Sequence, residues 1–195
     1  MNSMLEEKFR QWVQGKNPLE ARVSMYEKIR DIPYAVIPRL NHAERYVEIL
    51  KLGKGSCTPK HFLLCDMFQR LGLLVLYAVY PFRWGDWDPA EIDYPSSLWK
   101  LAQEQPVGHH IACRVEIGGR LVLVDATLDS GLKKSGLPVN SWDGITDTTL
   151  PVNPCGEEEL YHPLEARLMQ PRDYDEKALQ FYGELNRCFE EARGL

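Results

Sequence analysis

Residues 53–80 read GKGSCTPKHFLLCDMFQRLGLLVLYAVY, and this stretch decides the fold class of the chain. A glycine-bearing loop leads into Cys57, and Pro59 suits the first turn of a helix, where the N–H that proline lacks would have no partner. The helix that follows is apolar around most of its circumference, as expected of a buried, central helix. Gly72 ends it, and the apolar run after it predicts a buried strand. The stretch therefore predicts a central helix that begins at a cysteine.

The next informative stretch is residues 109–129, HHIACRVEIGGRLVLVDATLD. It predicts a β-hairpin, because the glycines at 118–119 favour a two-residue turn. Counting back from that turn, His110 becomes a diagonal neighbour of Asp125 on one face of the hairpin, within reach of its side chain. His109 then points to the opposite face. A register slip of one residue would exchange the two histidines, so the choice of His110 depends on this turn.

Helices are predicted on both sides of these stretches. Their positions are residues 5–13, a helix that opens at Pro18, residues 43–52, residues 97–103, and an amphipathic C-terminal helix that Asp173 caps with Glu176 in a capping box. The predicted fold class is α+β, with the central helix packed on an antiparallel β-sheet and additional N- and C-terminal helices. A length of 195 residues suits one domain, 1–195, with its core at about 26–128 and an irregular loop region and C-terminal helix over 129–195.

The composition excludes several classes of protein. Hydrophobic residues make up 44% and charged residues 26%, as in an ordinary globular protein rather than a disordered one. A net charge of -5, from 23 basic and 28 acidic side chains, argues against a nucleic-acid partner. The longest apolar run, residues 71–80, is too short to cross a bilayer, and the N-terminus does not resemble a signal peptide. We therefore predict a cytoplasmic protein without a membrane partner.

The chain contains five cysteines, an odd number that cannot pair completely within it. No two of them form a C-x-x-C pair, which counts against a structural zinc site, and no cofactor or metal is expected. Cys65, Cys113 and Cys188 lie on apolar faces and are interpreted as small buried side chains. Cys155 lies in a Pro-Gly loop, and its role stays open.

Cys57 has a different setting, because it directly precedes a predicted helix. The N-terminus of a helix lowers the pKa of a thiol, and its free N–H groups can stabilise an oxyanion. A histidine can take the proton of the thiol, and an aspartate beside that histidine fixes its tautomer. Cys57, His110 and Asp125 fit these roles, although a tight-turn cysteine and a cross-strand hydrogen bond are structural alternatives. His61, one helical turn from Cys57, is a rival base but is interpreted as a helix-surface side chain.

These segments resemble the transglutaminase-like superfamily of papain-related cysteine enzymes. The loop at 55–57 reads Gly-Ser-Cys, His110 precedes Asp125 by 15 residues, and the aspartate is followed by Ala-Thr. The resemblance covers roughly residues 26–128. It implies a papain/transglutaminase-like core with Cys57 as the nucleophile, His110 as the general base and acid, and Asp125 as the orienting residue.

Some positions depart from that family pattern. Ala112 stands where many members carry an aromatic residue, and the oxyanion helper that some members supply upstream of the cysteine is not identifiable. Tyr34 is a weak candidate for that role, and a core tyrosine is the alternative. Four tryptophans fall in the predicted loops and could either bind substrate or pack those loops; they are Trp84, Trp87, Trp99 and Trp142.

The function expected from these residues is cysteine-dependent acyl transfer on an amide or ester through a thioester on Cys57. Hydrolysis and transamidation are equally compatible with the three residues, and the partner would be a peptide or another amide-containing substrate. The chain is thus expected to be a transglutaminase-like cysteine hydrolase or acyltransferase. A non-catalytic binding module on the same fold is the alternative, because a fold does not dictate a function.

Overall fold

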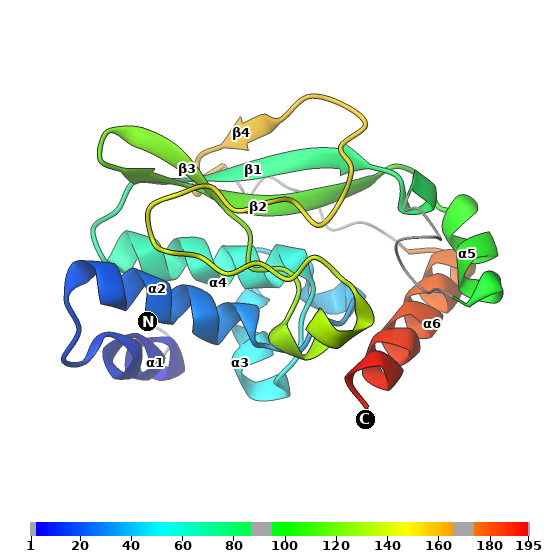
Figure 1. The fold of residues 1–195 in the computed structure, drawn as a ribbon, viewed down its shortest axis with the longest axis horizontal. Helices are drawn as coiled ribbons and strands as arrows, with labels where there is room; N and C mark the ends of the chain where they lie inside the picture. The colour runs from blue at the N-terminus through cyan, green and yellow to red at the C-terminus, as the bar shows by residue number, and fades with distance from the viewer. Residues whose placement is uncertain (1–2, 87–94, 166–173, 195) are drawn as a thin grey trace.

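A computed structural model describes residues 3–86, 95–165 and 174–194, and Figure 1 shows its arrangement. Within these ranges the strands form one antiparallel sheet in the order β3-β2-β1-β4. The strands are β1 (Val75–Phe82), β2 (Gly108–Ile117), β3 (Arg120–Val124) and β4 (Glu159–Tyr161). Helix α4 (Cys57–Arg70) packs on strands β1 and β2. The predicted α+β class, with a helix that begins at Cys57 on an antiparallel sheet, is confirmed.

The main core lies between α4 and the sheet. Leu63, Leu64 and Met67 of the helix are fully buried, and Val79 and Val115 face them from the strands. Removing this apolar surface from water contributes about 25 cal/mol per Å², so the contact between helix and sheet is a principal source of stability. The same packing places Cys57, the first residue of α4, beside β2.

Helices α1 (Ser3–Val13) and α2 (Pro18–Arg30) cover the side of α4 that faces away from the sheet (Figure 1). Both were predicted, and Pro18 opens the second. A capping box fixes the start of α2, because the Asn17 side chain accepts the N–H of Glu20 at 2.9 Å and the Glu20 carboxylate accepts the N–H of Asn17 at 3.0 Å.

The helix predicted over residues 43–52 is mostly wrong. Only a 3-10 turn over Tyr46–Glu48 and the short helix α3 (Ile49–Leu52) form there. The N–H of Glu44 donates to Nδ1 of His42 at 3.1 Å, so a side chain satisfies the backbone in a local turn before a helix can begin. Gly53, with a φ of 66°, ends α3 as predicted.

The hairpin has the predicted register. Ile117 pairs with Arg120 and Cys113 with Val124. The turn glycines at 118–119 have φ values of 60° and 82°, which residues other than glycine rarely adopt. This register brings the beginning of β2 beside the residues that follow β3.

Helices α5 (Ser96–Gln103) and α6 (Glu176–Arg193) lie at one end of the sheet (Figure 1). The short helix near residue 97 is confirmed. The predicted cap of the last helix is wrong, because Asp175 is the N-cap and its side chain accepts the N–H of Ala178 at 2.8 Å. A helix that begins at Glu176 places that residue next to its cap, so the two cannot form the predicted box. Asp173 lies outside the described residues.

The loop before Cys57 is held against an earlier segment of the chain. Gly55 donates its N–H to the carbonyl of Pro33 at 3.0 Å and accepts the N–H of Ala35 at 3.2 Å. A Cβ at Gly55 would lie 2.7 Å from Cγ2 of Ile49, so only glycine fits in this loop without a rearrangement. This close packing sets the direction in which the chain enters α4.

Candidate active site

Cys57 is the first residue of α4 and is half-buried. The side chain of Ser56, the N-cap residue, does not cap the helix but donates to Oδ1 of Asn41 at 2.7 Å. The first N–H groups of a helix have no acceptor within it, so those of Cys57 and Thr58 lie beside the sulfur without an intrahelical partner. This location favours negative charge both on the sulfur and on a neighbouring oxygen.

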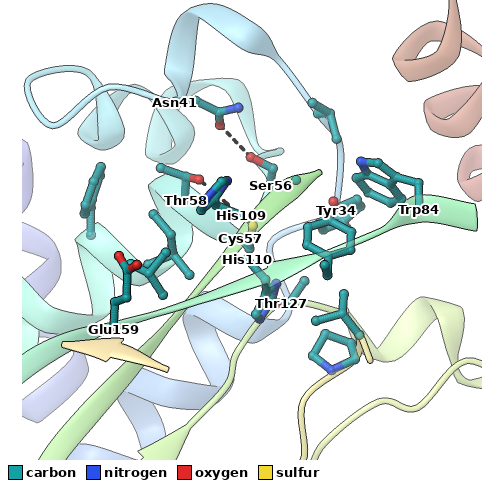
Figure 2. Close-up of a pocket in the computed structure, with 18 of the residues that line it drawn as sticks. Tyr34, Asn41, Ser56, Cys57, Thr58, Trp84, His109, His110, Thr127 and Glu159 are labelled. Atoms are coloured by element: carbon teal, nitrogen blue, oxygen red, sulfur yellow. Dashed lines mark hydrogen bonds between the residues drawn. The ribbon is translucent and has the colours of Figure 1, made fainter. Parts of the chain in front are cut away.

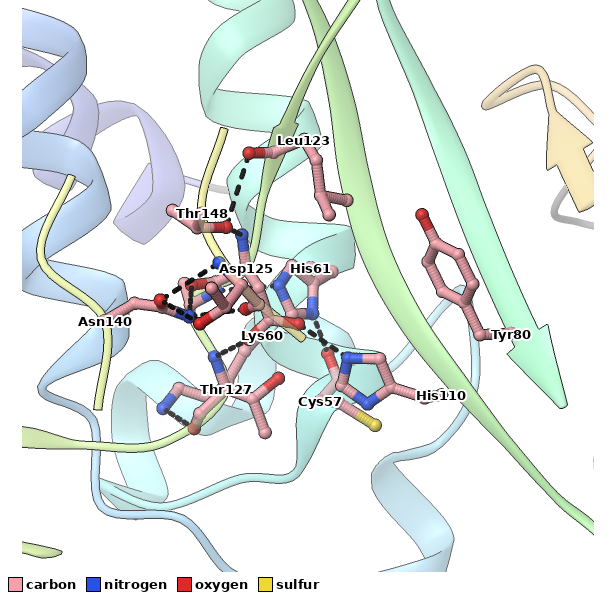
Figure 3. A network of polar contacts seen from close by, with 12 residues as sticks. Cys57, Lys60, His61, Tyr80, His110, Leu123, Asp125, Thr127, Asn140 and Thr148 are labelled. Atoms are coloured by element: carbon pink, nitrogen blue, oxygen red, sulfur yellow. Dashed lines mark hydrogen bonds and ion pairs between the residues drawn. The ribbon is translucent and has the colours of Figure 1, made fainter. Parts of the chain in front are cut away.

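The structure brings Cys57, His110 and Asp125 together (Figure 3). Nε2 of His110, in β2, lies 2.6 Å from Oδ2 of Asp125, which directly follows β3. Figure 3 shows the Cys57 sulfur beside the His110 ring, so this ring lies between the thiol and the carboxylate. Because Nε2 faces Asp125, Nδ1 is the nitrogen available to the sulfur. The predicted register thus selects the histidine that lies between these two groups.

The Asp125 carboxylate is held by further hydrogen bonds. Its Oδ1 accepts the N–H of Thr127 at 2.9 Å, and its own N–H donates to Oγ1 of Thr148 at 2.7 Å. Each carboxylate oxygen therefore has a partner, and the backbone of Asp125 is anchored as well. A carboxylate fixed in this way orients the imidazole ring that it contacts. Thr148, from the irregular stretch after the hairpin, was not singled out by the sequence.

The three groups shift each other's pKa values. Burial raises the pKa of the Cys57 thiol, but the neighbouring His110 and its charge outweigh that effect, and the net pKa lies below the ordinary thiol value. Burial alone would lower the pKa of His110, but the Asp125 carboxylate raises it to about 10. Asp125 is itself desolvated, yet the charge of His110 keeps its pKa below the usual range. The arrangement favours a thiolate beside an imidazolium.

The interpretation of His61 as a helix-surface side chain is wrong, because the residue is fully buried. Its Nε2 lies 2.9 Å from the backbone N of Ala126 and must accept that N–H. The neutral ring therefore carries its proton on Nδ1, which donates to the carbonyl of Cys57 at 2.9 Å. The ring joins the first turn of α4 to the residue after Asp125, and burial lowers its pKa to about 4.

Lys60 is a second buried side chain that the sequence did not reveal. Its Nζ donates to three backbone carbonyls, those of Arg30 and Ile32 at 2.8 Å and that of Thr127 at 2.7 Å. Burial lowers its pKa to about 7. The three bonds tie α4 to the end of α2 and to the segment after Asp125. The sequence signal for Lys60 and His61 is their position in a helix that is apolar around most of its circumference.

A buried ion pair fastens α6 to the same region. Arg193 donates to Oδ1 of Asp129 at 3.0 Å and to Oδ2 at 2.6 Å, and it also reaches the carbonyl of Tyr34 at 3.0 Å. Asp129 accepts the N–H of Tyr34 at 2.8 Å. Asp129 is desolvated, but Arg193 keeps its pKa below the usual range. Arg193 and Asp129, which are 64 positions apart in the sequence, thus hold the segment at Tyr34 beside the candidate site.

A cavity of about 800 Å³ opens beside Cys57, a size typical of small-molecule sites (Figure 2). His110 and His109 both line it, so His109 is close to the candidate site although His110 is the partner of Asp125. Tyr34 also lines it, as does Asn41, whose Nδ2 donates to the Tyr174 hydroxyl at 3.0 Å. The thiol is therefore accessible from an open space rather than enclosed in the core.

The tryptophans have different surroundings. Trp84 lines the cavity, whereas Trp142 packs in the main core. Trp99 is partly buried against the residues around α6. Trp87 lies outside the described residues. Of the described tryptophans, Trp84 is the one that reaches the candidate site.

The other thiols lie away from the cavity. Cys65 and Cys113 are fully buried as predicted, and burial, with the neighbouring Cys113, raises the pKa of Cys65. Cys155 is exposed, and Cys188 is half-buried against the apolar residues around α6 rather than fully buried. The buried face of α6 is formed by Phe181, Leu185 and Phe189, and Cys188 lies at the border of that face. Cys57 is the cysteine that combines access with a depressed pKa.

No group of three or more His, Cys, Asp or Glu side chains within the described ranges is arranged to hold a metal ion. In the same ranges, no helix has both the length and the apolar character needed to cross a membrane. Comparison of the chain with protein-family models, curated proteins and solved structures found no match in any of the three.

Proposed function

We propose that the protein is a cysteine-dependent acyl-transfer enzyme acting on an amide or ester. One observation carries this proposal: the imidazole of His110 lies beside the Cys57 sulfur and 2.6 Å from the buried carboxylate of Asp125, and Cys57 and His110 both line an open cavity. A thiol that is partly accessible and has a lowered pKa is suited to act as a nucleophile. The resemblance to transglutaminase-like enzymes supports the same roles.

In the first half of the reaction, the Cys57 thiolate attacks the substrate carbonyl, and a C–S bond forms. The oxygen gains a negative charge beside the N–H groups of Cys57 and Thr58, which can donate to it. Collapse of this intermediate breaks the C–N or C–O bond and leaves a thioester. His110, held by Asp125, transfers its Nδ1 proton to the departing amine or alcohol.

In the second half, water or an amine attacks the thioester. Neutral His110 takes the proton of the attacking group, the C–S bond breaks, and the thiolate of Cys57 is restored with the imidazolium beside it. Water yields a carboxylic acid and an amine yields a new amide. We therefore include both hydrolysis and transamidation, with a peptide or another amide as the substrate.

The proposal is tested by the rate at which iodoacetamide alkylates Cys57 between pH 4 and 9, measured by mass spectrometry. We expect wild-type Cys57 to react rapidly well below the pH at which an ordinary thiol ionises. In His110→Ala the rate at pH 6 should fall by about 10²-fold, because the partner that lowers the thiol pKa is lost. Exposed Cys155, in the same sample, supplies the rate of a reference thiol.

A Cys57 rate no higher than that of Cys155 at pH 6, unchanged in His110→Ala, would contradict the proposal and favour a binding module. A positive result should be followed by a screen of amide and ester substrates for release of an amine or alcohol. Cys57→Ala should abolish any turnover found. Turnover that persists in Cys57→Ala would assign the reaction to another group.

A further inference from the structure

The cavity beside Cys57 has two ends of different chemistry. We define the aromatic end by the rings that line it next to α6, and these are Tyr34, Phe82, Trp84, Tyr174 and Tyr182. We define the acidic end by Glu159, Tyr161 and Glu165. Figure 2 shows Cys57 between them, with Trp84 and Tyr34 to one side and Glu159 to the other. A substrate whose reacting carbonyl meets the sulfur can therefore extend toward both.

The aromatic end is a continuous surface of packed rings. Trp84 lies edge-on to Phe82, with ring centroids 4.9 Å apart, and to Tyr182 at 6.2 Å. Tyr174 contacts Tyr182 at 5.6 Å. Phe181 supports Trp84 from behind at 5.1 Å, so the indole ring is held in place. Packed aromatic rings of this kind bind apolar or aromatic groups.

The acidic end depends on the register in which the edge strand β4 pairs with β1. Glu159 pairs with Val79, and Tyr161 pairs with Tyr77. Val79 and Tyr77 belong to the core on the α4 face of the sheet, and directly opposed residues share a face. Glu159 and Tyr161 therefore point toward the side of the sheet on which Cys57 begins α4. The Tyr161 hydroxyl donates to Glu159, which holds that carboxylate at the cavity wall.

The neighbouring Glu158 provides an internal contrast. Its carboxylate accepts hydrogen bonds from Arg114, at 2.9 Å, and from Tyr80, so a cation of the protein already neutralises it. No lysine or arginine lines the cavity in the part of the chain that the structure describes, and there neither Glu159 nor Glu165 forms an ion pair. The two adjacent glutamates thus differ: the carboxylate of Glu158 has a cation, and that of Glu159 faces the cavity.

We propose that the acidic end binds a cationic group of the substrate, an alkylammonium or guanidinium, while the aromatic end binds an apolar or aromatic group. The reacting amide or ester would lie between them, at Cys57. A cation gains both from the carboxylates and from the face of Tyr161, whereas an anionic group at this position would be repelled. This inference rests on the proposed function, because it assigns the substrate class of the same site.

The test uses three chloroacetamides of equal length, with a 4-aminobutyl, a pentyl or a 3-carboxypropyl group on the amide nitrogen. In each, the Cys57 thiolate displaces chloride from the chloroacetyl carbon, so a C–S bond forms and chloride leaves. Mass spectrometry gives the rate at Cys57 for each probe. We expect the cationic probe to exceed the neutral one by about 3- to 10-fold and the anionic probe to be slowest. The preference should shrink at high salt.

The ratio of the cationic to the neutral rate is compared among variants, so that each variant provides its own reference. In Glu159→Gln the ratio should fall toward 1, and in Glu159→Lys the anionic probe should become the faster of the charged pair. Glu116→Gln removes an exposed carboxylate from β2 away from the cavity and should retain the wild-type ratio. It serves as the matched control for a change of net charge.

A ratio near 1 in the wild-type protein overturns this inference, as does a full preference that survives in the Glu159→Gln, Glu165→Gln double variant. Either result leaves the proposed function in place if Cys57 still reacts rapidly with iodoacetamide at low pH. Slow iodoacetamide reaction instead counts against the proposed function itself. The two ideas therefore fail by different measurements.

Discussion

Two buried histidines lie close to the candidate nucleophile, with ring centroids 6.1 Å apart. His110 on the sheet faces the Asp125 carboxylate, and its pKa is raised to about 10. His61 on the helix faces a carbonyl and an N–H of the backbone, and its pKa is lowered to about 4 by burial. At neutral pH the first is therefore charged and the second neutral.

The comparison separates two roles that burial alone does not distinguish. Desolvation disfavours the charged form of both rings, and only a carboxylate partner reverses that effect. A charged His110 can stabilise a thiolate and give up a proton. His61 can do neither at neutral pH, but its two hydrogen bonds set the position of Cys57 relative to the segment that carries Asp125. We therefore assign His61 a positioning role.

The largest expected effect comes from removing the charge that distinguishes the two rings. Asp125→Asn should lower the pKa of His110 toward that of an ordinary or buried histidine, and alkylation of Cys57 at pH 6 should slow by about 10² to 10⁴-fold. The measurements are an NMR titration of His110 and the alkylation rate. Glu116→Gln is the control for loss of one carboxylate. A rate within threefold of wild type would show that Asp125 does not set the charge of His110.

Lys60 is a third buried basic group, and like His61 it bonds the backbone. A change at Lys60 tests how much these bonds contribute to stability. Lys60→Met keeps the apolar stem but leaves three buried carbonyls without their donor, so the free energy of unfolding should fall by about 3 kcal/mol or more. Urea denaturation measures the loss. Lys51→Met, on an exposed position of α3, should change it by less than about 0.5 kcal/mol. Equal losses in both variants would exclude a role for the three bonds.

The pH dependence of stability should carry the signature of His61. Its folded pKa, about 4, lies below the ordinary value of 6.5, so the unfolded chain binds the proton more readily between these values. The contribution of His61 is thus complete above pH 6.5 and is lost as the pH falls toward 4, by roughly 3 kcal/mol at most. Wild-type protein should lose this much more stability than His61→Asn across that window. Parallel curves would contradict a buried, neutral His61.

His110 should act in the opposite direction on stability. Its folded pKa lies above 6.5, so its contribution is present below pH 6.5 and is lost as the pH rises toward 10. Stability therefore falls below pH 6.5 because of His61 and above pH 6.5 because of His110, so these two residues favour maximal stability near pH 6.5.

The smallest expected effect concerns the two hydrogen bonds of His61, to the Cys57 carbonyl and from the N–H of Ala126. His61→Asn can keep a donor near the Cys57 carbonyl, whereas His61→Gln can keep an acceptor near the N–H of Ala126. We expect alkylation of Cys57 at pH 6 to slow by about fivefold or less in either variant, because a neutral hydrogen bond contributes about 1 kcal/mol. A loss as large as that in Asp125→Asn would show that His61 acts through charge rather than position.

Much of the fold follows from local patterns in the sequence. The apolar helix after Cys57 and the two glycines at 118–119 were sufficient to predict the central helix and the hairpin register. These signals are local, because helix periodicity and two-residue turns depend on neighbouring residues. The turn at residue 44 was missed because the His42 side chain accepts a backbone N–H there. The cap at Asp175 was missed because, in the sequence, Asp173 and Glu176 have the spacing of a capping box.

The sequence by itself determined that Cys57 begins a buried helix and that His110, not His109, pairs with Asp125. Only the tertiary structure decided that these three meet, that His61 is buried, and that Glu159 faces the cavity. Those facts depend on contacts between segments far apart in the chain, such as Lys60 with the carbonyl of Arg30. Local propensity carries no information about such contacts, because long-range packing determines which polar groups lose water and which partners replace it.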